Sequence, residues 1–242
     1  MISLLNEYIS NDIGEITDIS YGQGEFIDKC YKYLCSIFNL TQNEFEQIYS
    51  LNDPKLLKHW RDWIMSNPSL FKNRKIKRTD FCINTDCFSK RYYKCIRENI
   101  GQNPDPIIII PLCYTTKIIN TDIYDHMVML IYRKNTNILE CFDPSNDLHP
   151  FTINQIRDIF NKQTVIIPHQ LYNGRIGLQK REENIGSKEM GYCAMWSFLF
   201  AELVLLYPDK KSKSIIKLLS TYSDYELKKL IRGYTMRMNN II

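Results

Sequence analysis

The segment 194–206 (AMWSFLFAELVLL) is apolar except for Ser197 and Glu202. A run of this length without a polar face predicts a helix that is buried on all sides, so the rest of the chain must pack around it. The preceding Gly-Tyr-Cys places Cys193 in the first helical turn. Unpaired N–H groups and the helix dipole make that end electropositive, which favours the thiolate form of a cysteine. Because free cysteines are more commonly small buried hydrophobic residues, other parts of the chain must decide the role of Cys193.

The size and charge of the chain exclude several classes of protein. With 242 residues and a net charge of +4, the chain fits one large domain, or a domain with an accessory lobe, and gives no indication of specific nucleic-acid binding. No stretch reaches the roughly 18 apolar residues of a membrane span, and the first residues lack the basic and apolar pattern of a signal peptide. We therefore expect a protein of the reducing cytoplasm that does not cross a membrane.

The eight cysteines are scattered along the chain without a C-x-x-C pair. In a chain without a signal peptide they are expected to be free thiols and not a disulfide framework. Cys82, Cys87 and Cys95 come nearest to a zinc-ligand cluster, but their spacing is irregular and no histidine lies nearby. We therefore expect no metal site and no cofactor.

The pattern of apolar residues changes near residue 101. Spacings of three and four predict helices in the first hundred residues, and β-branched runs then predict strands. The expected helices of the first part cover 24–39, 41–51, 52–66 and 88–99. The second part has expected strands at 107–116, on both sides of 134–137 and at 164–172, and expected helices at 152–162, 194–206, 211–220 and 223–239. This order predicts an α+β fold in which a small antiparallel sheet packs on the central buried helix. Residues 1–100 would form a helical accessory lobe, and residues 101–242 the core with a C-terminal helical tail.

A cysteine nucleophile needs a base, and the base needs an acceptor that orients it. His126 opens one predicted strand and Asp143 ends the next. If the hairpin turns tightly at 134–135, the two stand directly opposite each other with Cβ atoms about 4.5–5.5 Å apart. A register shift of two residues keeps them on one face, whereas a shift of one separates them. Both residues can equally be ordinary polar strand ends. The other histidines lack an equally placed acid and are expected to be structural or surface residues: His59, His149 and His169.

The order His126, Asp143, then Cys193 at the head of a buried helix resembles the Ulp/adenain clan of cysteine proteases, which includes the SUMO-specific proteases and the adenovirus proteinase. The segment 177–203 (GLQKREENIGSKEMGYCAMWSFLFAEL) is similar to versions found in large DNA viruses. The resemblance, which covers residues 107–207, implies a papain-like core, a Cys-His-Asp triad and a glutamine that helps bind the oxyanion. By this match Gln179 takes the last role, and a loop over 180–190 leads to the cysteine. Met127 stands where the SUMO proteases have a tryptophan that lines a diglycine tunnel.

The resemblance implies a thiol protease or isopeptidase that cleaves a protein substrate. That substrate would be a conjugate of ubiquitin or of a ubiquitin-like modifier, or a viral precursor, in the host cytoplasm or the virion. An acetyltransferase of the same fold and a non-catalytic binding or virion protein are the alternatives. Because the triad lies within 126–193, residues 1–100 are expected to select the substrate, unless their tryptophans only pack the lobe onto the core. The side chains that suit a recognition surface are Trp60, Trp63, Tyr92, Tyr93 and the basic run 72–78.

Overall fold

Most of the predicted accessory lobe lies outside the described residues. The computed structural model describes residues 1–14, 24–42, 97–98, 100–119, 122–148, 150–185 and 192–241. The predictions that fall outside these ranges are the helices within 43–96, the basic run 72–78, Trp60, Trp63, Tyr92, Tyr93, Cys82, Cys87, Cys95, His59 and His149.

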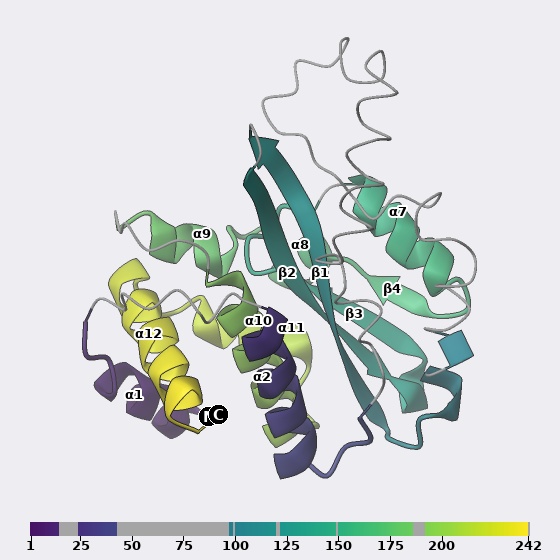
Figure 1. Ribbon diagram of the computed structural model, residues 1–242, viewed down its shortest axis with the longest axis horizontal. Coiled ribbons are helices and arrows are strands. Elements are labelled where there is room, and N and C mark those ends of the chain that lie inside the picture. Colours follow the sequence, from purple (N-terminus) through teal and green to yellow (C-terminus); the bar gives the residue numbers. More distant parts are fainter. Residues whose placement is uncertain are drawn as a thin grey trace.

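The protein has an α+β fold built on a four-stranded sheet with the order β1-β2-β3-β4 (Figure 1). The strands are β1 (Ile107–Ile119), β2 (Asp122–Arg133), β3 (Ile138–Phe142) and β4 (Thr164–Ile166). The first three are antiparallel, as expected, and β4 is added parallel to β3. The helix α7 (Pro150–Ile159) lies between β3 and β4 and returns the chain to the starting end, as a parallel pair requires.

The turn between β2 and β3 is longer than the sequence suggested. It contains a 3-10 turn, η3 (Lys134–Thr136), and Asn137 in the left-handed region with φ 53°. Arg133 therefore pairs with Ile138, and the prediction of a tight two-residue turn is wrong. The resulting shift of two residues preserves which face each side chain occupies, because side chains alternate with period two. His126 and Asp143 thus remain on one face, diagonal to each other instead of directly opposite.

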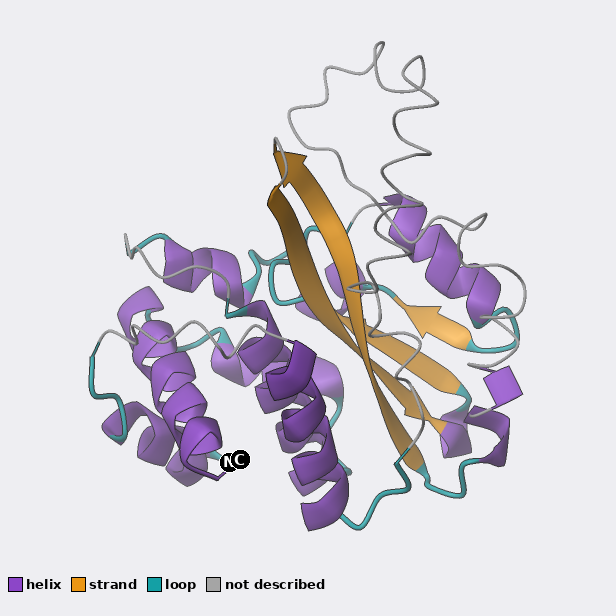
Figure 2. Ribbon diagram, viewed as in Figure 1, coloured by secondary structure: helices purple, strands orange, loops and turns teal. Residues whose placement is uncertain are grey.

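Strand β2 continues well beyond its pairing with β3. The β2–β3 ladder runs from Arg133 to Met129, which pairs with Phe142 at the end of β3. From there β2 continues with β1 alone, and the two strands form the ribbon that projects past the rest of the sheet in Figure 2. The sheet opens beside His126 in the sense that no β3 residue pairs with β2 there, because His126 lies past the end of the β2–β3 ladder.

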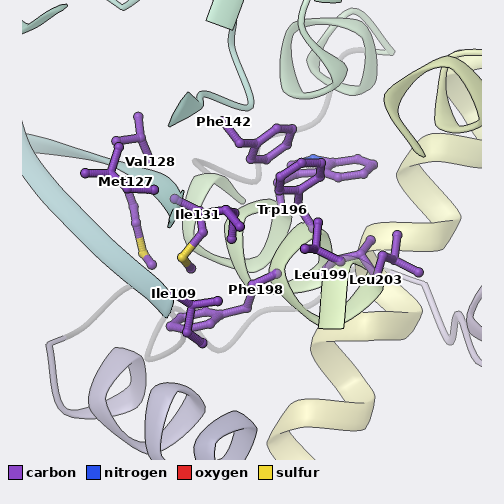
Figure 3. Packing of buried hydrophobic residues seen from close by; sticks show 14 of the residues in the cluster. Ile109, Met127, Val128, Ile131, Phe142, Trp196, Phe198, Leu199 and Leu203 are labelled. Carbon is purple, nitrogen blue, oxygen red and sulfur yellow. The ribbon is translucent and has the colours of Figure 1, made fainter. Parts of the chain in front are cut away.

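The apolar run forms the central helix α10 (Cys193–Leu206), as predicted, and every residue from Ala194 to Val204 is buried. It packs against β2, and α2 (Gly24–Ile37) and α12 (Asp224–Ile241) also contact it. Figure 3 shows Phe142 of the sheet beside Trp196 of this helix, and Ile109 beside Phe198. Stacked rings of Phe142 and Phe200, with centroids 4.0 Å apart, join β3 to the same helix.

The two helices described in the first part of the chain belong to this same core. Helix α1 (Ile2–Ser10) packs along α12, and α2 contacts α10. Their buried residues, which include Leu5, Tyr8, Cys30 and Leu34, form one cluster with those of the sheet and α10. Helices α1 and α2 therefore contribute to the packing around the central helix.

The remaining elements differ from the sequence expectation in two places. The predicted strand 164–172 ends at Ile166, because Pro168 begins the short helix α8 (Pro168–Tyr172). The expected loop 180–190 begins inside another short helix, α9 (Leu178–Glu183).

Helices α11 (Ser212–Leu219) and α12 confirm the predicted helical tail. The hydroxyl of Ser223 accepts a hydrogen bond from the Glu226 N–H at 3.2 Å, and the Glu226 carboxylate accepts one from the Ser223 N–H at 2.7 Å. This reciprocal cap satisfies two donors that the helix itself leaves unpaired. Among the described residues, none of the helices combines the length and apolar character needed to cross a membrane.

Candidate active site

His126 and Asp143 form the centre of the site. The His126 Nε2 lies 2.8 Å from the Asp143 Oδ1, across the gap where β3 has ended. The imidazole is 12% exposed and the carboxylate is fully buried. Because Nε2 is occupied by the carboxylate, Nδ1 is the ring nitrogen that remains for another partner.

Cys193 lies beside this imidazole, at the first position of α10. A side-chain hydrogen bond between the two is one cause of the raised pKa of His126. Of the cysteines whose side chains the structure describes, Cys193 alone is partly exposed, whereas Cys30, Cys35 and Cys141 are buried. Burial raises the pKa of Cys30 to about 12 and that of Cys35 to about 11, so both stay protonated. Among these four described thiols, the one beside His126 is thus the thiol that an external molecule can reach.

His126 and Asp143 form the pair of oppositely charged side chains in the site. Burial alone lowers the pKa of His126, but the Asp143 carboxylate, the hydrogen bonds to Asp143 and Cys193 and the charge of the sulfur together raise this pKa to about 10. Burial alone raises the pKa of Asp143, but the His126 charge and hydrogen bonds from His126 and from backbone N–H groups lower it. The imidazolium and the carboxylate therefore stabilise each other at neutral pH.

The segment 143–147, named here the acid turn, holds the carboxylate in place. The Ser145 N–H donates to Asp143 Oδ1 at 2.9 Å, and the Asp147 N–H donates to Oδ2 at 2.7 Å. Neither donor was predicted from the sequence, although the segment 143–147 (DPSND) has a composition that indicates them. An aspartate followed by proline and small polar residues favours a turn in which its side chain binds N–H groups farther along the chain.

Helix α9 and Gly177, the residue before it, pack closely against the acid turn. A Cβ atom at Gly177 would overlap the backbone of Pro144 and Ser145, so only glycine fits at this position. The Gln179 N–H donates to the Pro144 carbonyl at 3.0 Å, and the Tyr172 hydroxyl donates to the same carbonyl at 3.4 Å. The acid turn is thus held from the outside as well as by its own hydrogen bonds.

Gln179 lies on the acid side of the site. It is 5% exposed, its Oε1 accepts a hydrogen bond from the Ser145 hydroxyl at 3.2 Å, and its Nε2 donates to Glu183 at 2.8 Å. One Nε2 hydrogen is left for another acceptor, because an amide nitrogen carries two. The oxyanion role of Gln179 remains a prediction.

The helix start contributes the remaining polar groups. Tyr192 occupies the N-cap position of α10 without a side-chain cap, and its carbonyl accepts the Trp196 N–H at 2.8 Å. The N–H groups of the first turn, beginning with that of Cys193, point along the helix axis towards its electropositive end. They are suited to meet a negative oxygen that forms on an atom bonded to the sulfur.

His169, which was expected to be a structural or surface residue, is exposed at the second position of α8. Within the described ranges, no group of three or more His, Cys, Asp or Glu side chains is placed to hold a metal ion. Comparison of the chain with family models, with curated proteins and with solved structures found no match.

Proposed function

We propose that the protein is a cysteine hydrolase, a thiol protease or isopeptidase, that uses Cys193 as nucleophile, His126 as base and acid, and Asp143 as the acceptor that orients the imidazole. One observation carries the proposal. A partly exposed thiol at a helix start lies beside an imidazole whose Nε2 is held 2.8 Å from a buried carboxylate. This is the arrangement that nucleophilic catalysis by cysteine requires.

The reaction divides into two acyl transfers. The sulfur attacks the substrate carbonyl carbon while its proton resides on His126, and the carbonyl oxygen becomes negative. N–H groups at the start of α10, with the remaining Nε2 hydrogen of Gln179, stabilise that oxygen. His126 then gives its proton to the leaving amine, and the carbon–nitrogen bond breaks to leave a thioester. Water, deprotonated by His126, attacks the thioester and releases the carboxylic acid and the thiol.

The substrate is proposed to be a protein, with ubiquitin and ubiquitin-like modifiers as the leading class and a viral precursor as the other. Met127 is 1% exposed, so its side chain belongs to the core and does not line a substrate channel. Any tunnel for a narrow carboxy-terminal tail must therefore be built from other residues than the one that follows His126.

Electrophilic probes test this proposal directly. Ubiquitin and SUMO that carry a carboxy-terminal electrophile, together with a short peptide electrophile, are incubated with the protein, and the modified residue is identified by mass spectrometry. We expect labelling at Cys193 that is lost in His126→Ala. The matched control is Cys35→Ala, which removes a buried thiol that lies in α2 and leaves labelling intact.

The same experiment separates the alternatives. An acetyltransferase would label with an acetyl donor thioester and retain the acetyl group on Cys193 until an amine acceptor is added. A non-catalytic protein would label its exposed thiol at the same slow rate in the wild type and in His126→Ala. The latter result would overturn the proposal.

A further inference from the structure

Ser197 is one of the two polar residues in the apolar run, and the proposed reaction gives it no part. It is fully buried, one helical turn beyond Cys193 on the same side of α10. Its hydroxyl donates to the Met127 carbonyl of β2 at 3.2 Å. The residue before Met127 is His126, so one hydrogen bond joins the helix of the nucleophile to the strand of the base.

The bond joins two elements. Serine and threonine within helices commonly bond the carbonyl four residues earlier in their own helix, as Thr235 does with a 2.7 Å bond to the Ile231 carbonyl in α12. Ser197 instead donates to another element, as does the buried Ser212 of α11, whose hydroxyl donates to the Glu140 carboxylate of β3 at 2.6 Å. The hydrogen bond of Ser197 therefore constrains the position of α10 relative to β2, whereas a hydrogen bond within one helix does not.

The position of the bond matches the place where the sheet opens. The β2–β3 ladder ends at Met129, so the next part of β2 has no β3 residue beside it. The Ser197 hydroxyl supplies a donor to the strand backbone at this point. Apolar packing alone allows α10 to slide along β2, because it is not directional. A hydrogen bond from a fully buried hydroxyl fixes one position along that direction, since breaking it leaves polar groups without partners in the core.

We propose that Ser197 is a positioning residue that sets the separation between the Cys193 sulfur and the His126 imidazole through its hydrogen bond to the Met127 carbonyl. The inference rests on the proposed function, and it assigns to that site a residue outside the triad. It explains why a hydroxyl stands at this point of a helix that is otherwise apolar on every side near its start. Glu202, the other polar residue of the run, has partners of a different kind on α1 and α12.

The test measures how fast iodoacetamide alkylates Cys193, read peptide by peptide across the neutral and alkaline pH range. We expect Ser197→Ala to slow alkylation at neutral pH by about tenfold to a hundredfold, because a displacement of about 1 Å is enough for a loss of that size. Its pH profile is expected to approach that of His126→Ala. Thr235→Val removes an equally buried hydroxyl far from the site, and we expect it to leave the rate and the profile unchanged.

A double variant distinguishes positioning from a general structural role. If Ser197 acts through His126, Ser197→Ala causes no further loss in the His126→Ala background, because coupled residues are not additive. Equal losses in both backgrounds, or an unchanged rate in Ser197→Ala, overturn the inference. Ser197→Thr keeps a hydroxyl and is expected to restore most of the rate. A folded Ser197→Thr protein as slow as Ser197→Ala also overturns it.

Two further experimental outcomes bear on the role of Ser197. If Ser197→Ala does not fold, Ser197→Cys replaces it with the same expected loss, because a thiol is only a weak donor. If His126→Ala alkylates as fast as the wild type, the proposed function itself fails, and the role of Ser197 fails with it. The His126→Ala measurement therefore shows which of the two proposals is in error.

Discussion

Buried carboxylates lie near both ends of α10, but the hydrogen bonds that start from them lead to different chemical groups. Near its C-terminal end, Glu202 accepts a hydrogen bond from the Tyr8 hydroxyl at 3.1 Å and one from the Arg237 guanidinium at 3.1 Å. Arg237 in turn donates to the Tyr33 hydroxyl at 3.3 Å. These partners come from α1, α12 and α2, so the hydrogen bonds join three helices to the central one, and the series ends at the partly buried Tyr33.

At the N-terminal end, the corresponding chain of hydrogen bonds reaches the surface. Asp143 is as buried as Glu202, and both of its oxygens are also bonded. Its chain runs through His126 to the sulfur of Cys193, which is partly exposed. Hydrogen bonding to both oxygens of a buried carboxylate therefore does not by itself indicate a structural or a catalytic role. The two ends differ in the last group that each series of hydrogen bonds reaches, which is the Tyr33 phenol at one end and a thiol beside an imidazole at the other.

The largest expected effect concerns the acid of the N-terminal end. In Asp143→Asn the side chain keeps its shape but cannot stabilise an imidazolium, so turnover should fall about 10³- to 10⁴-fold. The substrate is the fluorogenic derivative of whichever modifier labels Cys193, and thermal melting monitors the fold. A loss below tenfold in a folded protein would mean that Asp143 only fills space at a strand end.

The next effect concerns the acid of the C-terminal end. Glu202→Ala leaves Arg237 without its carboxylate in a mostly buried setting, and we expect a loss of about 3 kcal/mol in the free energy of unfolding. Turnover per folded molecule should stay the same, since the network does not reach the thiol. Asp209→Ala, which removes an exposed carboxylate after the same helix, is the control and should change stability little. Reduced turnover in folded Glu202→Ala would show that the two ends are coupled.

Two glycines, one near each end of α10, allow substitutions with smaller expected effects. Gly177 presses on the acid turn, and Gly233 presses on the Tyr8 backbone where α12 crosses α1; a Cβ at either would overlap backbone atoms. We expect Gly177→Ala to lower turnover about tenfold to a hundredfold by moving the acid turn. Gly233→Ala should instead lower the free energy of unfolding by about 1–3 kcal/mol, with normal turnover of the folded fraction.

Gly101 supplies the matched control for this pair. A Cβ at Gly101 would have no atom within 4 Å, so Gly101→Ala should alter neither turnover nor stability appreciably. The distinction between the two ends would be lost if Gly177→Ala and Gly233→Ala reduced turnover and stability in the same proportion.

The smallest effect is a difference in how stability depends on pH. The His126 pKa is raised from 6.5 to about 10, so its contribution is complete below pH 6.5 and is lost as the pH rises towards 10. The Asp143 pKa is lowered from 3.8, so its contribution is complete above pH 3.8 and is lost as the pH falls through the lowered value. The melting temperature difference between the wild type and His126→Ala should therefore be largest between pH 3.8 and 6.5.

The Glu202 end provides the reference for that measurement. Arg237 does not lose its proton in the alkaline range, so the melting difference between the wild type and Glu202→Ala should hold between pH 6.5 and 10. Parallel decline of both differences over this range would contradict the assignment of the alkaline change to His126.

Several parts of the site could be predicted because they depend on neighbours along the chain. The apolar run specified a buried helix, and the residue just before it specified the position of the thiol. The shared face of His126 and Asp143 was also predictable, because strand side chains alternate regardless of the turn's exact length. These features follow from periodicity, which acts over a few residues.

The exact register could not be predicted in the same way. It depends on the four-residue turn that ends at Asn137, and a left-handed asparagine leaves only a weak signal in the sequence. The helix that starts at Pro168 replaced half of a strand whose composition favoured β structure. In both places, packing and turn geometry outweighed residue preferences, which are worth only about 1 kcal/mol.

Sequence patterns were enough to predict a thiol at the head of a buried helix, and a histidine and an aspartate on one face of a hairpin. Long-range contacts place His126 just past the end of the β2–β3 ladder, bond the Ser197 hydroxyl to the adjacent strand, and enclose Glu202 with helices from both ends of the chain. The physical reason is separation along the chain. Periodicity is written within a few residues, whereas these contacts join residues up to 194 positions apart, and the packing of the whole core selects which of them form.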